Sequence, residues 1–251
     1  RLARVVWRKK QRLLEDENIY FVACSHWLEQ EAKSSALLKG HKITSIPNPI
    51  DTHIYNNRCN KQEARQRLGL PADKKLILFV SQRVTNRNKG MDYLMEACDM
   101  LKDLPQLGVV ILGGHAEEVS TQLPTFPLGY VNDEHRIVDV YNAVDVFVLP
   151  SLSENLPNTI MEAMACGVPC VGFRVGGIPE EIDHKQNGYV ADYRSAEDLA
   201  RGIRWILTEA DYESLSQHAV QKVAQTYSQQ SVALKYLDIY QQAMAFKHYG
   251  L

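Results

Sequence analysis

Short apolar segments alternate with amphipathic segments along most of this 251-residue chain. The apolar segments run without polar interruption, which is typical of strands whose sheet is covered on both faces. The segments between them have helical periodicity. The strand-like segments are KLILFVSQ, GVVILGG, FPLGYV, DVFVLPS and PCVGF. The alternation therefore predicts an α/β fold with a doubly wound, Rossmann-like parallel sheet.

The composition excludes several classes of protein. The net charge of −2 creates no basic field that would attract nucleic acid. The longest apolar runs have the length of strands and are too short to cross a membrane. No signal peptide is visible. The five cysteines are scattered without metal-ligand spacing, so we expect reduced thiols and a cytoplasmic protein.

The first residues, RLARVVWRKKQRLL, predict a basic amphipathic helix. Such a helix can lie on an anionic membrane surface, which leaves peripheral attachment at the inner face of a membrane as one interpretation. The other interpretation is a solvated helix that packs on a further part of a longer protein. Farther along, Pro47 and Pro49 restrict the backbone of KITSIPNPID, so we predict a linker there.

Ligands of doubly wound folds bind outside the carboxyl ends of the strands. The stretch SENLPNTIMEAMACGVP, residues 153–169, follows one of these ends, which we place at Ser151. It carries Glu154 in the loop and Glu162 in a helix predicted over residues 158–166. Pro157 suits the first turn of that helix, and Gly167 suits the position just past its end.

The start of this helix predicts an anion site, because the free N–H groups near Leu156 and Asn158 have no partners within the helix. With the two acids, it suits a ligand that carries a phosphate at the helix end and hydroxyls on both sides. A surface acid followed by a helix acid that favours the dipole explains the spacing equally well.

Two more loops follow strand ends at the same edge of the sheet. SQRVTNRNKG supplies Arg83, Arg87 and Lys89, cations that suit a diphosphate. RVGGIPEE supplies Gly176 and Gly177, which let the backbone approach a ligand closely or simply form a turn.

These segments, in this order, resemble the carboxyl-terminal half of a GT-B fold retaining glycosyltransferase of the family 4 type (glycosyl transferases group 1). SIPNPID resembles the signature that begins the second domain, and the block from PLGYV to GGIPEEI resembles the donor site with its pair of acids. The resemblance implies that residues 1–45 are the truncated end of an acceptor domain. Residues 46–251 would form the donor domain, whose final helix, 231–246, crosses back toward the first domain.

The resemblance also implies residue roles. Glu154 would contact hydroxyls of the donor sugar, and Glu162 would hold the ribose. Arg83 and Lys89 would neutralise the diphosphate, and the backbone N–H groups of Leu156 and Asn158 would assist. Because the spacing between Arg83 and Lys89 is one residue longer than is common in the family, Arg87 competes with Arg83 for this role.

Further donor contacts are implied around these residues. Gly129, Tyr130 and Val131 would border the nucleobase. Positions around Asn155–Asn158 and Gly176–Ile178 would select the sugar. The donor would be a UDP- or GDP-sugar and the acceptor a glycan or lipid-linked saccharide. No cofactor or metal is expected, and the isolated chain is expected to be inactive in transfer.

Three other classes of function stay open from the sequence, and one of them is an epimerase or phosphorylase of related fold. A non-catalytic nucleotide-binding module would share the loops but has no need of Glu154 at the sugar position. A dinucleotide oxidoreductase would need G-x-G-x-x-G after its first strand, which LGGH does not match.

Overall fold

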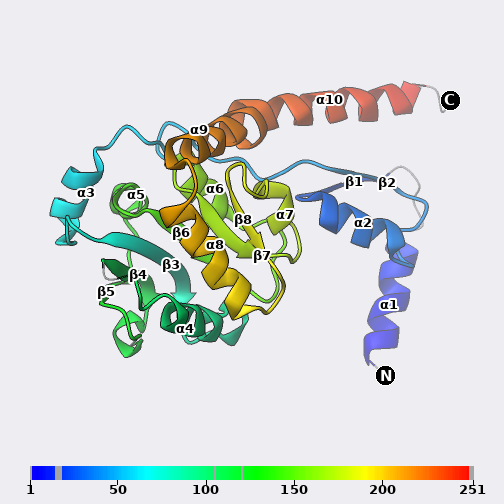
Figure 1. Cartoon of the computed structure of the whole chain (residues 1–251). Coiled ribbons are helices and arrows are strands. Elements are labelled where there is room, and N and C mark those ends of the chain that lie inside the picture. Colours follow the sequence, from blue (N-terminus) through cyan, green and yellow to red (C-terminus); the bar gives the residue numbers. More distant parts are fainter. Residues whose placement is uncertain (1, 15–18, 105, 120, 249–251) are drawn as a thin grey trace.

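The computed structural model describes residues 2–14, 19–104, 106–119 and 121–248 (Figure 1). Its centre is a sheet of six parallel strands in the order β5-β4-β3-β6-β7-β8. The strands are β3 (Lys75–Arg83), β4 (Leu107–Gly114), β5 (Thr125–Gly129), β6 (Val146–Leu149), β7 (Cys170–Phe173) and β8 (Gly188–Ala191). This is the doubly wound fold that the alternating sequence predicts.

Successive side chains of each strand point to opposite faces of the sheet, so these apolar strands make both faces apolar. Helices cover both faces and remove them from water. On β3, Leu76 and Leu78 belong to one core cluster, whereas Ile77 and Phe79 belong to the other. The first cluster includes residues of α3 (Lys61–Leu68), α5 (Glu134–Ala143), α6 (Asn158–Ala165) and α9 (Tyr212–Lys222). The second includes residues of α4 (Met91–Met100) and α8 (Ala196–Thr208).

A smaller parallel pair of strands precedes this sheet. It consists of β1 (Tyr20–Ala23) and β2 (Lys42–Ser45), joined by α2 (His26–Ser34), while α1 (Leu2–Leu13) comes before β1. The prediction of a linker over all of KITSIPNPID was therefore wrong for its first four residues. The backbone restriction of Pro47 begins at Ile46, so residues 42–45 are free to pair with β1. The division at residue 45 stays a prediction.

Three local details differ from the sequence-based expectations. Strand β6 ends at Leu149 rather than Ser151. Pro157 occupies the N-cap of α6, with ψ 112°, and not its first turn. The segment IPEE, expected as loop, forms the short helix α7 (Ile178–Glu181), with Pro179 in the first turn where no N–H is needed. Gly167 has φ 73° just past α6, as its position predicted.

The chain ends in a π-helical turn (Val223–Tyr227) and the 20-residue helix α10 (Gln229–His248), whose far end projects beyond the sheet domain in Figure 1. Four large side chains of α10 are each more than half exposed: Leu234, Leu237, Tyr240 and Met244. The crossing of this helix toward a first domain stays a prediction. Among the described residues, no helix is both long enough and apolar enough to span a membrane.

Candidate active site at the carboxyl edge of the sheet

The order in which successive strands are added to the sheet reverses between β3 and β6. Strands β4 and β5 lie on one side of β3, and β6, β7 and β8 lie on the other. At such a switch point the loops that follow the two central strands separate and leave a crevice. The end of β3 and the loop that follows it hold the predicted cations, and the loop after β6 holds Glu154, so the topology brings together two motifs that are far apart in the sequence.

The two loops are in direct contact. Lys89 Nζ donates to Glu154 Oε1 at 2.5 Å, and the N–H of Leu152 donates to the carbonyl oxygen of Asn88 at 2.8 Å. The side chains of Lys89 and Glu154 are only 32% and 14% exposed, so this ion pair is partly withdrawn from solvent. A partly buried pair is screened less than a surface pair, and each partner holds the other in place.

Arg83 and Arg87 occupy different surroundings. Arg83 is the last residue of β3 and lines an open hollow of about 460 Å³ together with Gln82, Gly114, His115 and Tyr130. We call this the strand-end hollow. Arg87 lies in a single turn of 3-10 helix, Arg87–Lys89; it is exposed, as Arg83 is, but it is not among the residues that line the hollow.

The residues expected beside a nucleobase are the last residue of β5, Gly129, and the two that follow it. Tyr130 is 58% exposed on the wall of the strand-end hollow, so its ring is free to stack on a ligand. Gly129 has φ 68°, a conformation that glycine adopts without strain, and it turns the chain at the end of β5. Val131 is partly buried against the core cluster of the α6 face, which fixes the segment from the other side.

The start of α6 stands beside the same edge. Leu156 is 6% exposed, and Asn158 begins the helix. The side-chain oxygen of Asn158 accepts a hydrogen bond from Asn48 Nδ2 at 3.3 Å. Pro157, at the N-cap, makes no side-chain cap to the first turn, so the helix end keeps its positive partial charge.

Glu162 points into a largely buried environment one turn along α6. Its Oε2 accepts a hydrogen bond from the hydroxyl of Tyr141 at 2.8 Å. Burial raises the pKa of the Glu162 carboxyl, the hydrogen bond from Tyr141 lowers it in part, and Glu134 raises it further. Sequence reasoning missed Tyr141, because in YNAVD it reads only as one apolar position of the helix α5.

The structure gives a different reason for the paired glycines. A Cβ on Gly176 would overlap the backbone oxygen of Glu154, and one on Gly177 would overlap that of Asn155. The N–H of Gly177 also donates to the Asn155 oxygen at 2.7 Å. The close approach that these glycines allow is thus made to the loop that carries Glu154. The side chain of Asn155 turns toward the β1–α2 junction.

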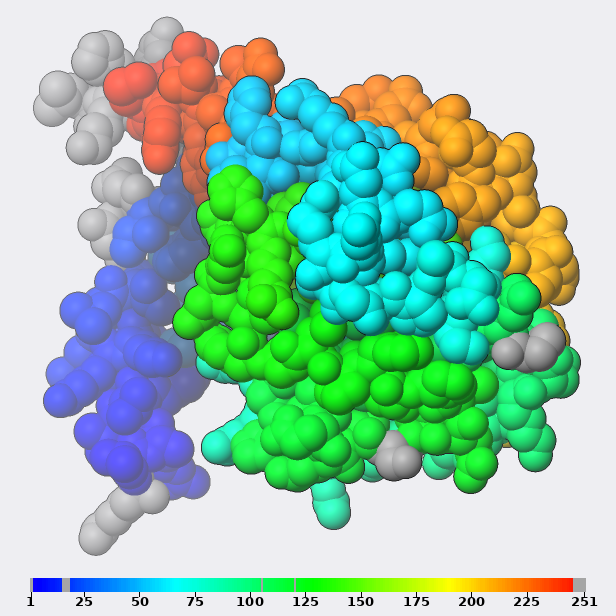
Figure 2. Space-filling view, turned by 90° about the vertical axis from the view of Figure 1, so that its left-hand side faces the viewer, coloured from blue at the N-terminus to red at the C-terminus, as the bar shows by residue number. Residues whose placement is uncertain are grey.

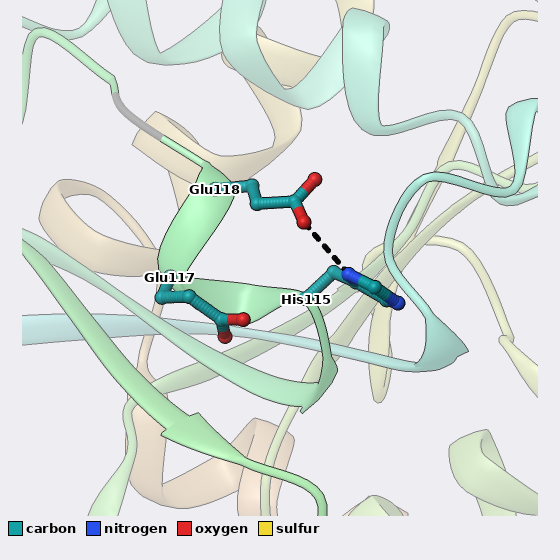
Figure 3. A group of neighbouring side chains, drawn as sticks. All are labelled: His115, Glu117 and Glu118. Carbon is teal, nitrogen blue, oxygen red and sulfur yellow. Dashed lines mark hydrogen bonds and ion pairs between the residues drawn. The ribbon is translucent and has the colours of Figure 1, made fainter.

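Three side chains of metal-ligand type gather beside the hollow, although the sequence indicated no such cluster. Figure 3 shows Glu118 turned toward His115, with Glu117 beside them. His115 Nδ1 and Glu118 Oε1 are 2.7 Å apart, and ligand atoms of all three lie within 4.8 Å of one another. All three are exposed, and the carboxylate of Glu118 is already paired with His115, so the cluster does not by itself define a metal centre.

Solved structures of known proteins share this architecture. A glycosyltransferase from Rickettsia africae ESF-5 superposes with a TM-score of 0.80 at 20% identity, over 94% of this chain and 66% of that one. Anabaena Alr3699/HepE in complex with UDP-glucose superposes with a TM-score of 0.72 at 20% identity, over 89% and 64% of the two chains. The fold is thus the Rossmann-like α/β fold of GT-B glycosyltransferases.

Sequence comparison identifies the family. The sequence model of glycosyl transferases group 1 matches residues 60–224. The putative teichuronic acid biosynthesis glycosyltransferase TuaC of Bacillus subtilis is 36% identical over 183 residues, which are 72% of this chain and 45% of that protein. The chain therefore belongs to the glycosyl transferases group 1 family. It spans about half the length of the curated relatives it matches.

Proposed function

We propose that this chain is the donor-binding part of a retaining glycosyltransferase. It would take a UDP- or GDP-sugar and pass the sugar to a glycan or a lipid-linked saccharide during polysaccharide biosynthesis. The observation that carries the proposal is the contact between Lys89 and Glu154 beside the start of α6. It unites a cation for a diphosphate and an acid for sugar hydroxyls at the switch point of the sheet.

The ion pair suggests how the donor would be received. An incoming diphosphate would compete with Glu154 for Lys89, because both are anions within reach of one ammonium group. Glu154, once released, would accept hydrogen bonds from sugar hydroxyls near the reacting carbon. Arg83 and the N–H groups at the start of α6 would share the negative charge that develops on the departing diphosphate.

The ribose and the base of the donor would be bound by other residues around Lys89 and Glu154. Glu162, oriented by Tyr141, would accept hydrogen bonds from the ribose hydroxyls. Tyr130 and the backbone at Gly129 and Val131 would border the base in the strand-end hollow. Bond breaking would then depend on positioned charge more than on a dedicated nucleophile of the protein. UDP-glucose bound to HepE, which shares the fold, is consistent with this class of donor.

The acceptor would be bound mainly by a first domain of the whole enzyme, on the side of β1, β2 and α2. In α1, the large apolar residues Leu2, Val5, Val6, Trp7 and Leu13 are exposed among basic residues. Attachment of this helix to an anionic membrane surface on the cytoplasmic side would bring the enzyme to a lipid-linked acceptor.

Calorimetric titration of the chain with UDP and GDP tests the proposal. We expect one of them to bind, and we expect Glu162→Ala to weaken that binding by about tenfold to a hundredfold, the equivalent of a charge-assisted hydrogen bond. Tyr141→Phe should weaken it by about two- to tenfold, because Tyr141 orients Glu162 but does not itself hold the ribose. Glu96→Ala, on the exposed side of α4, serves as the control. Binding of neither nucleotide, or tight binding of NAD, would contradict the proposal.

A second titration separates Arg83 from Arg87. We expect Arg83→Ala to weaken nucleoside diphosphate binding by about tenfold or more, because Arg83 lines the strand-end hollow. Arg87→Ala should change the dissociation constant by less than about twofold, because Arg87 does not line the strand-end hollow. The reverse order of the two effects would assign the diphosphate to Arg87.

A further inference from the structure

Two side chains near Glu154, those of Asn155 and Glu180, make hydrogen bonds to the β1–α2 junction. Asn155 Nδ2 donates to Cys24 Sγ at 2.8 Å, and Asn155 Oδ1 accepts from the Ser25 hydroxyl at 2.5 Å. Both polar ends of the Asn155 side chain are therefore used by consecutive residues of the junction. Ser25 is 1% exposed, so this contact is closed to solvent on that side.

Glu180, in α7, holds the other side of the same junction. Its Oε2 accepts the N–H of His26 at 2.8 Å, and its Oε1 accepts the N–H of Trp27 at 2.7 Å. These are the first two amides of α2, and the Ser25 hydroxyl accepts the N–H of Leu28 at 3.0 Å. A carboxylate at this end is favoured by the unpaired N–H groups and by the positive end of the helix dipole.

Both contacts are mechanically connected to Glu154. Asn155 is its neighbour in the chain. Helix α7 starts directly after Gly176 and Gly177, which pack against the backbone oxygens of Glu154 and Asn155. A displacement of α2 would thus be transmitted to the Glu154 loop through Asn155 on one side and through α7 on the other.

These hydrogen bonds lie where the N-terminal segment and the sheet domain are otherwise separated by a cleft. A cleft of about 350 Å³ lies beside them, and its lining includes Ser25, His26, Pro47, Leu156, Glu180 and Tyr227. Figure 2 shows that the N-terminal segment stands off from the body of the sheet domain over much of its length. Of the residues that the structure describes, none in β1, α2 or β2 belongs to either core cluster of the sheet domain, whereas Asn155 and Glu180 join that domain to the β1–α2 junction by hydrogen bonds.

We propose that Asn155 and Glu180 form a clasp that positions Glu154 relative to α2 and thereby sets the affinity of the site for the sugar part of the donor. The proposal rests on the proposed function for its donor. Asn155 and Glu180 are positioning residues in it, because they act through the Glu154 loop. By linkage, a sugar held by Glu154 should in turn tighten the clasp.

The first test needs no ligand. In amide NMR spectra of the 251-residue chain, Glu180→Ala should accelerate hydrogen exchange at the His26 and Trp27 amides by about tenfold or more, since each loses a charge-assisted hydrogen bond. The same variant should shift the amide resonance of Glu154. Glu180→Gln, which keeps the shape and one acceptor oxygen, should have an intermediate effect, and Glu96→Ala should have none. Unchanged exchange, or an unchanged Glu154 resonance, would overturn the clasp.

The second test addresses the sugar. Titrations compare UDP with UDP-glucose, and GDP with GDP-mannose, on the wild type, Asn155→Ala, Glu180→Ala and Glu96→Ala. We expect the two clasp variants to bind the bare nucleotide within about twofold of the wild type and to lose about fivefold or more of the affinity for the sugar conjugate. Equal losses for both ligands would overturn the proposal. If the wild type binds no nucleotide, the proposed function fails, whereas the exchange experiment still decides whether the clasp exists.

Discussion

Gly176→Ala should destabilise the chain by about 2–5 kcal/mol and displace the loop that carries Glu154. Gly176 has φ 56°, which costs a non-glycine residue about 1–2 kcal/mol. In addition, the new methyl group would overlap the backbone oxygen of Glu154, and that atom cannot move as a flexible side chain can. Overpacking of this kind typically adds about 1–3 kcal/mol.

Gly129→Ala provides a matched control, because Gly129 has a similar φ of 68° and open space where its Cβ would lie. It should lose only the conformational part, about 1–2 kcal/mol. Thermal unfolding without ligand measures both changes, with about 2–4 °C of melting temperature expected for each kcal/mol in a chain of this size. The difference between the two variants isolates the contact with Glu154.

The same pair of variants separates stability from function. Gly176→Ala should weaken the binding of a sugar nucleotide beyond any effect on the bare nucleotide, because Glu154 moves with the loop. If Gly176→Ala and Gly129→Ala lose equal stability, the backbone contact with Glu154 is absent in solution. The paired glycines would then be a simple turn, the alternative that the sequence left open.

Much of the fold follows from periodicity, and its exceptions have local causes. Continuous apolar runs between helical segments were sufficient to predict the sheet, because strands covered on both faces leave no polar positions. The strand of residues 42–45 was missed because the prolines that follow it dominated the interpretation of the whole segment. The helix α7 was missed because IPEE is a single turn, too short to show a period.

The sequence was enough to predict those parts of the candidate site whose position depends only on charge and on the order of the strands. The rule of strand ends was enough to place Lys89 and Glu154 on the same edge, and the structure joins them in an ion pair. It could not show that Asn155 turns to Cys24 and Ser25, or that Gly176 and Gly177 pack on a neighbouring loop. Those contacts depend on tertiary neighbours more than 20 residues away in the chain.

Glu181 lies in an environment that is unusual for a glutamate. It lies on α7 behind the Glu154 loop, 0% exposed, and neither carboxylate oxygen has a hydrogen-bond partner among the described residues. Burial raises the pKa of this carboxyl well above its usual range; the charges of Glu154 and Glu180 raise it further, and Lys222 opposes them. The surroundings of Glu181 in the folded protein therefore favour the neutral form of its carboxyl.

The sign of the pH dependence follows from proton linkage. Between the ordinary pKa of a glutamate, about 4.3, and the raised pKa of the folded state, the folded chain keeps a proton that the unfolded chain releases. Glu181 accordingly makes the free energy of unfolding fall by about 1.4 kcal/mol for each unit by which the pH rises over that interval. Glu181→Gln removes the dependence, because glutamine has the same shape and is neutral in both states.

We therefore expect the melting temperature of Glu181→Gln, relative to the wild type, to rise as the pH rises above the ordinary pKa of a glutamate, with Glu96→Gln as the exposed control. A difference that stays constant with pH would mean that Glu181 has an ordinary pKa and a partner in solution. A rising difference has a consequence for the site as well. It would show that the carboxyl group beside the Glu154 loop is neutral. A charged Glu181 would favour the protonated form of Glu154 and so weaken the negative charge with which Glu154 would bind the hydroxyls of the donor sugar.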